Sequence, residues 1–346
     1  MSNPGFFGGR DVVRWGIIGC GDVTEKKSGP GFQKAAGSSL VAVMRRDAAK
    51  AADYAKRHGV ARWYANADEL IADPEVDAVY VATMPDTHAL YALKIAAAGK
   101  PAYIEKPMAR HAPECDRMVE AFVKAKLPLF VAYYRRRLPR FLLVEEFIKG
   151  GRLGTITGIG YRFAAPFHAL NDTWRVDVAS AGAGHFLDMG SHVLDLIDYL
   201  CGSLEHVAGR SANLASGYSV EDTVMVNFSA RGVPGTAVFN FAGAVRDDSL
   251  RITGTLGEVT LSVFGNEAVR LETAQGVETF ERPNPEHVAQ PLIQSIVDDL
   301  LGRGVCPSTG ESGRRASRVM DAALEGYYGG RADEFWKREK TWPGRR

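Results

Sequence analysis

The stretch Val12–Gly31, VVRWGIIGCGDVTEKKSGPG, decides the fold. Within it a short apolar run, Val13–Ile18, leads directly into the glycine turn Gly19-Cys20-Gly21. An apolar strand that ends in such a turn and continues as a helix is typical of the first βαβ unit of a dinucleotide-binding domain. Farther along, Gly29-Pro30-Gly31 is expected to break the first helix soon after it starts.

The two glycines of the turn have separate tasks in this interpretation. Gly19 permits the tight turn, and Gly21 lets the backbone approach a pyrophosphate without a clash from a Cβ atom. The N–H groups of Asp22 and Val23 would then begin a helix and face the phosphates. Thr24 stands where the fingerprint prefers glycine or alanine, which is the one departure from the motif.

Short apolar runs alternate with helical segments as far as Ala132, and this alternation indicates a parallel, doubly wound sheet. After Tyr133, strand-like runs separated by glycine and charged turns predict a mostly antiparallel sheet. We expect an α/β chain with an N-terminal Rossmann domain, residues 1–134, and a C-terminal α+β domain with a large open sheet, residues 135–346. The helices expected in the second domain are Arg140–Lys149, His185–Leu200, Glu286–Leu301 and Gly313–Tyr328.

Composition excludes several classes of function. The net charge of +1 gives no electrostatic reason to bind nucleic acid or an anionic membrane. No apolar run is long enough to span a bilayer, and Met1–Arg10 lacks the apolar core of a signal peptide. The four cysteines show no CxxC spacing, so neither a zinc site nor a disulfide framework is expected. These features predict a soluble protein of the cytoplasm.

The end of the second strand bears on the choice of cofactor. Enzymes that use NAD usually place a carboxylate there, but this chain continues from Met44 with Arg45-Arg46-Asp47. An arginine pair suits the 2′-phosphate of NADP, so Arg45 and Arg46 predict NADP as the preferred cofactor and NAD as the alternative. The competing interpretation is that both arginines are solvated and that Asp47 caps the next helix.

Lys106 is the first candidate for chemistry. It ends a parallel strand, at the sheet edge where ligands of open α/β folds bind. Hydride transfer from an alcohol leaves a hydroxyl proton to be removed, and a lysine whose pKa is lowered by burial can remove it. Pro107 biases the preceding residue toward extended geometry. A surface lysine is the competing interpretation.

Asp188 and His192 form the second candidate group. They are four residues apart, hence on one helix face, where a carboxylate can orient an imidazole that relays a proton. A hydrogen-bonded structural pair is the other interpretation. The same spacing could hold a metal ion, but no third ligand accompanies it, so no metal is expected.

Other residues are candidates for the substrate pocket. The face of Trp174 and the polar groups of Arg175 suit a polyhydroxy ring. Arg135 follows the last Rossmann strand, close to where a phosphate would lie, although an arginine run is more often a solvated face. His168 and Tyr161 are weaker candidates.

The segment Tyr103–Pro107, a strand followed by Glu-Lys-Pro, resembles the signature of the Gfo/Idh/MocA family of oxidoreductases. Val81–His88 is similar to the family's fourth-strand loop, which borders the nicotinamide. Ala181–Gly184, followed by D-x-G-x-H at Asp188–His192, is similar to the family's small-residue stretch. The resemblance covers nearly the whole chain, and it implies reversible oxidation of an alcohol on a sugar or cyclitol, with frequent oligomerisation through the sheet.

The resemblance and the residues together give one set of expected roles. Because an open sheet leaves one face to cover, a homodimer or homotetramer is expected through residues 155–280. Two alternatives remain open: redox-assisted cleavage of a glycoside, and a non-catalytic regulator that senses the dinucleotide. The expected catalytic residues are Lys106, His192 and Asp188; the expected cofactor ligands are Gly19, Gly21, Asp22, Val23, Arg45, Arg46, Thr83, Met84, His88, Glu105, Lys106 and Arg135; and the expected substrate ligands are Lys106, Trp174, Arg175, Asp188 and His192.

Overall fold

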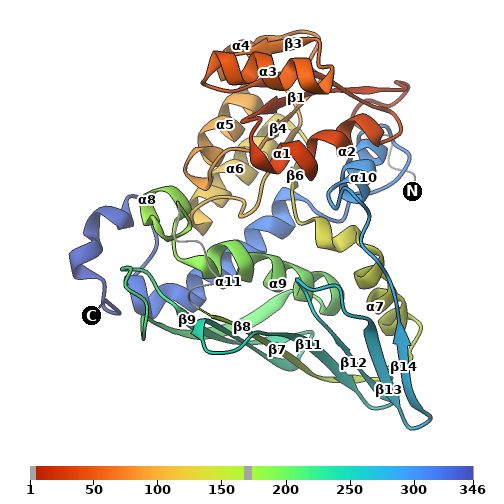
Figure 1. The fold of residues 1–346 in the computed structure, drawn as a ribbon, viewed down its shortest axis with the longest axis vertical. Coiled ribbons are helices and arrows are strands. Elements are labelled where there is room, and N and C mark those ends of the chain that lie inside the picture. Colours follow the sequence, from red (N-terminus) through yellow and green to blue (C-terminus); the bar gives the residue numbers. More distant parts are fainter. Residues whose placement is uncertain (1–4, 167–173, 346) are drawn as a thin grey trace. The chain divides into compact units, whose positions relative to one another are not determined.

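The computed structural model describes residues 5–166 and 174–345. The chain divides into two compact units (Figure 1). The first comprises Met1–Ala109, Glu114–Arg137 and Pro285–Arg314, and the second comprises Arg110–Pro113, Leu138–Asn284 and Arg315–Arg346.

A six-stranded sheet forms the centre of the first unit. All its pairings are parallel, in the order β3-β2-β1-β4-β5-β6, which confirms the Rossmann class expected from the sequence. The strand order reverses beside β1, the place where such sheets bind ligands at their carboxyl ends. The strands are β1 (Val13–Ile18), β2 (Ser38–Met44), β3 (Arg62–Tyr64), β4 (Ala78–Val81), β5 (Ala102–Ile104) and β6 (Leu129–Val131), and the helices are α1 (Asp22–Lys26), α2 (Gly29–Lys34), α3 (Ala48–His58), α4 (Ala67–Ala72), α5 (Pro85–Ala97), α6 (Ala112–Ala125, whose first two residues belong to the second unit), η1 (Tyr134–Arg137) and α10 (Gln290–Leu300).

Helix α10 shows that a single boundary near residue 134 does not describe how the chain packs. The helix was expected in the second domain, yet its buried Leu292, Ile293 and Ile296 belong to the same hydrophobic cluster as Trp15 and Phe32. The apolar face of α10 buries against the Rossmann core, so the chain returns to its first unit after completing most of the second.

The break expected after the first helix also has a different form. Helix α1 does end early, at Lys26, but Gly29-Pro30-Gly31 does not remain a loop. It opens α2 with Pro30 in the first turn, where the missing N–H group costs no hydrogen bond.

The second unit contains an eight-stranded sheet in the order β14-β13-β12-β11-β7-β10-β9-β8. Every pairing is antiparallel except that of β7 with β10, as the mostly antiparallel prediction requires. Its strands are β7 (Ile156–Pro166), β8 (Leu204–Ala212), β9 (Thr223–Ala230), β10 (Val233–Gly243), β11 (Asp247–Gly254), β12 (Gly257–Leu261), β13 (Val269–Thr273) and β14 (Gly276–Phe280), and its helices are α7 (Pro139–Lys149), η3 (Trp174–Val176), α8 (Val178–Ala181), α9 (His185–Cys201), the part of α11 (Gly310–Tyr328) from Arg315 onward, and η4 (Phe335–Thr341).

Helices α9 and α11 lie along one face of this sheet, and Figure 1 shows no described helix on the opposite face. Side chains of the covered face, such as Phe239, are fully buried. On the other face the strand register sets Val238 beside Arg162 and Met225. The uncovered face therefore mixes apolar and charged side chains.

Candidate active site

Four neighbouring strands of the first unit end at the same level. The register pairs Ile18 with Val81, Val81 with Ile104, and Ile104 with Val131. The segments that follow these strands therefore share one edge of the sheet. They are the glycine turn, the loop at Thr83, the Glu-Lys-Pro segment and the start of η1, so the sheet brings the predicted cofactor segments together.

The two glycines of the turn differ in the space around them. Gly19 has a φ of +90°, and a Cβ atom there would lie 2.7 Å from Cγ2 of Thr83. Its N–H donates to the carbonyl of Met44, which fixes the turn to β2. A Cβ on Gly21 would meet no described atom closer than 3.9 Å. That side of the turn is open, and no described side chain caps the start of α1.

Thr24 fits the turn although it departs from the fingerprint. Its hydroxyl donates to the carbonyl of Gly21 (2.7 Å), and its own carbonyl accepts a hydrogen bond from the hydroxyl of Tyr54 on α3 (3.0 Å). A Cβ on Gly29 would lie 2.2 Å from that Thr24 carbonyl oxygen. No local sequence pattern points to Tyr54, which supports the turn from thirty residues away.

Glu25 ties the short helix α1 to α3. Its carboxylate pairs with Arg57 (2.8 Å) and lies 2.8 Å from Nε2 of His58. The hydrogen bonds from Arg57, followed by those from His58, lower the pKa of Glu25 to about 2, although partial burial opposes this shift. A helix of five residues thus keeps its place through contacts with a longer one.

The two arginines at the end of β2 lie in different environments. Arg45 is half-buried, and its Nη1 donates to the carbonyl of Cys20 inside the glycine turn (3.2 Å), whereas Arg46 is exposed. Asp47 caps α3 by accepting the N–H of Lys50 (3.1 Å), as the competing interpretation proposed for it. Arg45 is therefore the arginine that lies against the turn.

The loop after β4 contains one exposed and one buried candidate. Met84 is 42% exposed, and the Thr83 hydroxyl accepts a hydrogen bond from Thr87 (2.8 Å). His88 is fully buried, with Nδ1 3.0 Å from the carbonyl of Pro107 and Nε2 3.1 Å from that of Thr83. Burial lowers the pKa of His88, and these carbonyl groups oppose that effect. His88 thus bridges two loops of the site.

The Glu-Lys-Pro segment is organised by a buried tyrosine. The hydroxyl of Tyr80 donates to Glu105 (2.5 Å), whose other oxygen accepts the backbone N–H of Lys106 (3.0 Å). The ring of Tyr80 stacks on Tyr103 at 4.7 Å, and burial, then the Glu105 charge, raises its pKa well above the usual range. Glu105 thus fixes the backbone at Lys106, and Tyr80 is a residue that the sequence analysis missed.

The arginines of η1 are not a solvated face. Arg135 and Arg136 are 7% and 3% exposed, and Arg136 donates to the carbonyl of Pro307 (2.9 Å). The guanidinium of Arg135 lies 5.1 Å from the ring centroid of Tyr134. The role of Arg135 toward a phosphate stays a prediction.

The candidate residues of the second unit form a separate group. Arg175 donates to Asp188 (2.8 Å), and its guanidinium lies 4.7 Å from the centroid of the Trp174 ring. His192, one helical turn after Asp188 on α9, is 4% exposed and faces the ring of Phe264 at 6.2 Å. The pairing of Arg175 with Asp188 was not expected from the sequence.

The weaker candidates differ in status. Tyr161 is buried and donates to Asp248 (3.0 Å) in the second sheet. His168 lies outside the described residues.

Within residues 5–166 and 174–345, no group of three or more His, Cys, Asp or Glu side chains could hold a metal ion. No helix in that part of the chain is long and apolar enough to span a membrane.

Comparison with known proteins adds to this geometry. Residues 13–133 match the profile described as the oxidoreductase family with an NAD-binding Rossmann fold, and residues 141–260 match the GFO/IDH/MocA C-terminal domain. The chain belongs to the Gfo/Idh/MocA family of oxidoreductases. Its first unit is accordingly an NAD-binding domain, as the glycine turn and the Glu-Lys-Pro segment had indicated.

Individual Gfo/Idh/MocA relatives span most of the chain. Oxidoreductase P35 of Formosa agariphila is 35% identical over 89% of this chain and 97% of its own. Inositol 2-dehydrogenase 2 of Saccharopolyspora erythraea is 28% identical over 89% of this chain and 91% of its own. A levoglucosan dehydrogenase, in complex with NADH and levoglucosan, superimposes with a TM-score of 0.81 at 22% identity, covering 90% of this chain and 96% of that one, which shows a shared fold.

Proposed function

We propose that this oxidoreductase transfers hydride between NADP(H) or NAD(H) and an alcohol or carbonyl carbon of a sugar, cyclitol or related polyhydroxy substrate. One observation carries the proposal: the glycine turn, the Thr83 loop and Glu105-Lys106 follow strands that end at the same edge of one sheet. The similarity to an inositol dehydrogenase and to a levoglucosan dehydrogenase supports the substrate class.

The residues of the turn fit a dinucleotide. Gly21 leaves one side of the turn open, and the N–H groups of Asp22 and Val23 begin a helix that no described side chain caps. A bound nicotinamide supplies the acceptor or donor of the hydride. Arg45, which contacts the turn, favours a 2′-phosphate, so NADP(H) is the proposed preference.

The chain's own groups handle the proton. Oxidation of a C–OH group releases its hydroxyl proton, and reduction of the carbonyl requires one. We assign this proton to Lys106 and His192, with Asp188 one helical turn before His192 on α9. Arg175 neutralises Asp188, and Trp174 offers an aromatic face to a polyhydroxy ring.

A screen of sugars, cyclitols and their keto forms with both cofactors tests the proposal. A change in nicotinamide absorbance that depends on the substrate is the expected result. Cleavage of a glycosidic bond without a net change would instead indicate redox-assisted hydrolysis. Cofactor binding without turnover of any compound would indicate a regulator and would contradict the proposal.

The uncovered face of the second sheet supports a proposal about assembly. An open sheet of eight strands leaves a broad face, and Met225, 40% exposed, lies on it beside Val238. We expect a homodimer or homotetramer that uses this face. Light scattering at micromolar concentration should give a multiple of 37.6 kDa, and Met225→Asp should lower it. A mass of one chain for the unchanged protein would refute the expectation.

A further inference from the structure

The turn that precedes α9 is held at two backbone positions. The N–H of Gly184, the residue before the first turn of the helix, lies 3.1 and 3.2 Å from the two carboxylate oxygens of Glu221. The carbonyl of Gly182 accepts a hydrogen bond from Nη2 of Arg331 (2.9 Å). Glu221 is 0% exposed, and so is the side chain of Arg331. Two buried charged side chains thus form hydrogen bonds with the two ends of the three-residue turn, residues 182–184.

The turn has no room for other residues. A Cβ on Gly184 would lie 2.7 Å from the backbone carbonyl oxygen of Glu221. Gly182 has a φ of +94°, and a Cβ there would lie 2.6 Å from the carbonyl oxygen of Arg110. Both obstacles are backbone atoms, which cannot rotate away. The small residues of this stretch are therefore needed for its contact with the buried charges.

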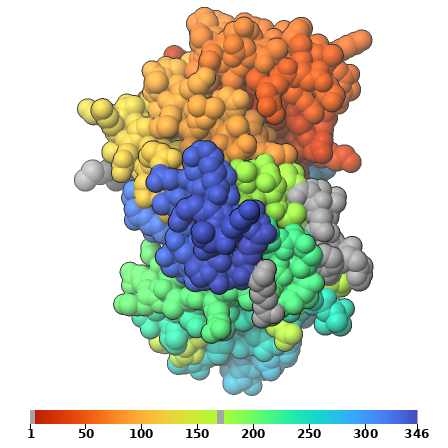
Figure 2. All heavy atoms as spheres, turned by 90° about the vertical axis from the view of Figure 1, so that its left-hand side faces the viewer, coloured from red at the N-terminus to blue at the C-terminus, as the bar shows by residue number. Residues whose placement is uncertain are grey.

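The end of α11 and the C-terminal segment supply the other half of this contact. Tyr328, fully buried, donates its hydroxyl to Glu221. Arg331 also pairs with Asp321 and donates to the carbonyl of Arg110. The ring of Trp342 packs on Tyr328 with centroids 4.7 Å apart. In Figure 2 the C-terminal segment of this unit, coloured dark blue, lies at the surface beside green residues of the same unit.

We propose that Glu221, Tyr328 and Arg331 are positioning residues that fix the start of α9 and thereby the placement of Asp188 and His192. The proposal rests on the proposed function, which gives Asp188 and His192 their roles. Asp188 lies one helical turn after Gly184, so a shift of the N-terminus moves it directly. A displacement of about 1 Å at a reacting group can cost about a hundredfold in rate. An anionic Glu221 also stabilises the positive end of the helix dipole.

Glu221 also makes this contact sensitive to pH. Burial raises its pKa to about 7, against the hydrogen bonds of Tyr328 and Gly184 and the charge of Arg331. The other titratable groups on the surrounding elements are His185 on α9, Tyr327 and Asp321 on α11, Asp222 and Tyr218 beside Glu221 in the chain, and Arg110 and His111 on the segment before α6. Among them, the carboxylate of Asp222 accepts hydrogen bonds from the backbone N–H groups of Leu214, Ala215 and Ser216.

Two adjacent tyrosines provide a matched pair of variants. Tyr328→Phe removes the hydroxyl that donates to Glu221, whereas Tyr327→Phe removes one that donates to the carbonyl of Ser219 (2.7 Å). Glu221→Gln keeps an acceptor for the N–H of Gly184 but removes the charge, and Glu221→Ala removes both. If the alanine variant fails to fold, the two phenylalanine variants still decide the question.

Hydrogen exchange provides a measurement that needs no substrate. Amides of Gly184–Asp188 should exchange at least tenfold faster in Tyr328→Phe than in the wild type, and faster still in Glu221→Ala. They should exchange at the wild-type rate in Tyr327→Phe and at a rate between those of the wild type and Glu221→Ala in Glu221→Gln. Equal effects of Tyr328→Phe and Tyr327→Phe, or no effect of either, would overturn the proposal.

Kinetics on a substrate from the screen provide the second measurement. Tyr328→Phe should lower kcat/KM about tenfold or more, whereas the Kd of the reduced cofactor should stay within about twofold. Glu221→Gln, which keeps the acceptor but not the charge, should restore only part of the activity lost in Glu221→Ala and should remove a step near pH 7 from the kcat/KM profile. An unchanged profile in Glu221→Gln would contradict the positioning role. If the wild type converts nothing, the proposed function fails, and hydrogen exchange alone decides the positioning.

Discussion

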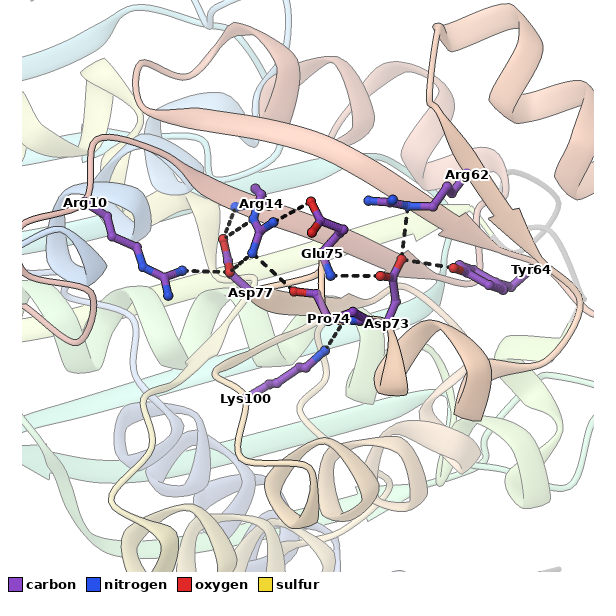
Figure 3. A network of polar contacts seen from close by, with 9 residues as sticks. All are labelled: Arg10, Arg14, Arg62, Tyr64, Asp73, Pro74, Glu75, Asp77 and Lys100. Carbon is purple, nitrogen blue, oxygen red and sulfur yellow. Dashed lines mark hydrogen bonds and ion pairs between the residues drawn. The ribbon is translucent and has the colours of Figure 1, made fainter.

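The two edges of the Rossmann sheet are both rich in charged residues, but they use them differently. At the amino edge, shown in Figure 3, Asp77 accepts hydrogen bonds from Arg10 (2.8 Å) and from the guanidinium and backbone of Arg14. Glu75 pairs with the same Arg14 (2.6 Å). Charge at this edge is neutralised within the chain.

A second group in Figure 3 continues the same pattern. Asp73, which is 8% exposed, pairs with Arg62 (3.1 Å) and accepts the hydroxyl of Tyr64 (3.0 Å). Lys100 donates to the carbonyl of Asp73 (2.7 Å). These contacts connect β3 with the segments that precede β4 and β5, so the charged groups of this region are neutralised within the chain and contribute to stability.

The carboxyl edge has an open glycine turn in place of such a network. The space next to Gly21 is free of described protein atoms, and Glu105 is used to fix the backbone of Lys106. Charged residue types occur at both edges, so residue type alone does not mark a site. A charged residue points to a ligand site only when it lies at the carboxyl end of a strand, because open α/β sheets bind ligands at that edge.

The largest expected effect is that of Lys106→Ala. It should lower kcat by about 10²–10⁴-fold, the range for the loss of a general acid or base, with little change in the melting temperature. The matched control is Lys100→Ala at the opposite edge. That variant loses its bond to Asp73 and about 1 kcal/mol of stability, but kcat should not change. Steady-state kinetics and thermal unfolding of both variants provide the comparison, and equal kcat values would remove Lys106 from the chemistry.

Asp77→Asn should show the opposite pattern to Lys106→Ala: stability should fall and kcat should stay the same. It removes charged hydrogen-bond acceptors from two arginines, so the free energy of unfolding should fall by about 2 kcal/mol, whereas kcat should stay unchanged. Burial opposes the ionisation of Asp77, but the hydrogen bonds from Arg14 outweigh it and the pKa is lowered.

This lowered pKa fixes the direction of the pH dependence. The stabilisation by Asp77 is present above about pH 4 and is lost as the pH falls through the lower pKa of the folded state. Denaturant unfolding between about pH 6 and 2 should therefore show a smaller loss of stability in Asp77→Asn than in the wild type. Parallel curves would show that Asp77 does not contribute in this way.

The smallest of these effects concerns the cofactor. NADP(H) should bind at least about tenfold more tightly than NAD(H), a difference of about 1.4 kcal/mol, because Arg45 lies against the glycine turn. Arg45→Asp should reduce or reverse that preference. Arg46→Asp, at an exposed position, should change it less. Titration of each protein with both reduced cofactors measures the preference. Equal affinities of the wild type for NADP(H) and NAD(H) would contradict the proposed preference.

Elements with strong local signals were predictable from the sequence. The bounds of β1 (Val13–Ile18) agree with the apolar run that predicted it, and α7 and α9 agree to within one residue at each end with the expected helices Arg140–Lys149 and His185–Leu200. In α3 the signal includes both ends, since Asp47 caps the start and Gly59, with a φ of +65°, ends the helix.

Short or exposed strands and contacts between distant segments were not predictable in this way. Strands β3, β13 and β14 were missed: β3 has three residues, and β14 is exposed along most of its length. The partners Tyr54 of Thr24, Tyr80 of Glu105, and Arg175 of Asp188 were also missed. A local pattern predicts a residue's secondary structure, but the hydrogen bonds of its side chain depend on how distant segments pack.

Transfer of deuterium from the substrate to the nicotinamide shows whether the protein moves a hydride. A polyhydroxy substrate from the screen, deuterated at the carbon that bears the reacting hydroxyl, is incubated with the enzyme and oxidised cofactor. Hydride transfer should place one deuterium in the reduced nicotinamide for each keto product formed, at a rate that falls with Lys106→Ala. Deuterium that remains entirely in a cleaved or unchanged sugar, with no reduced cofactor, would contradict it.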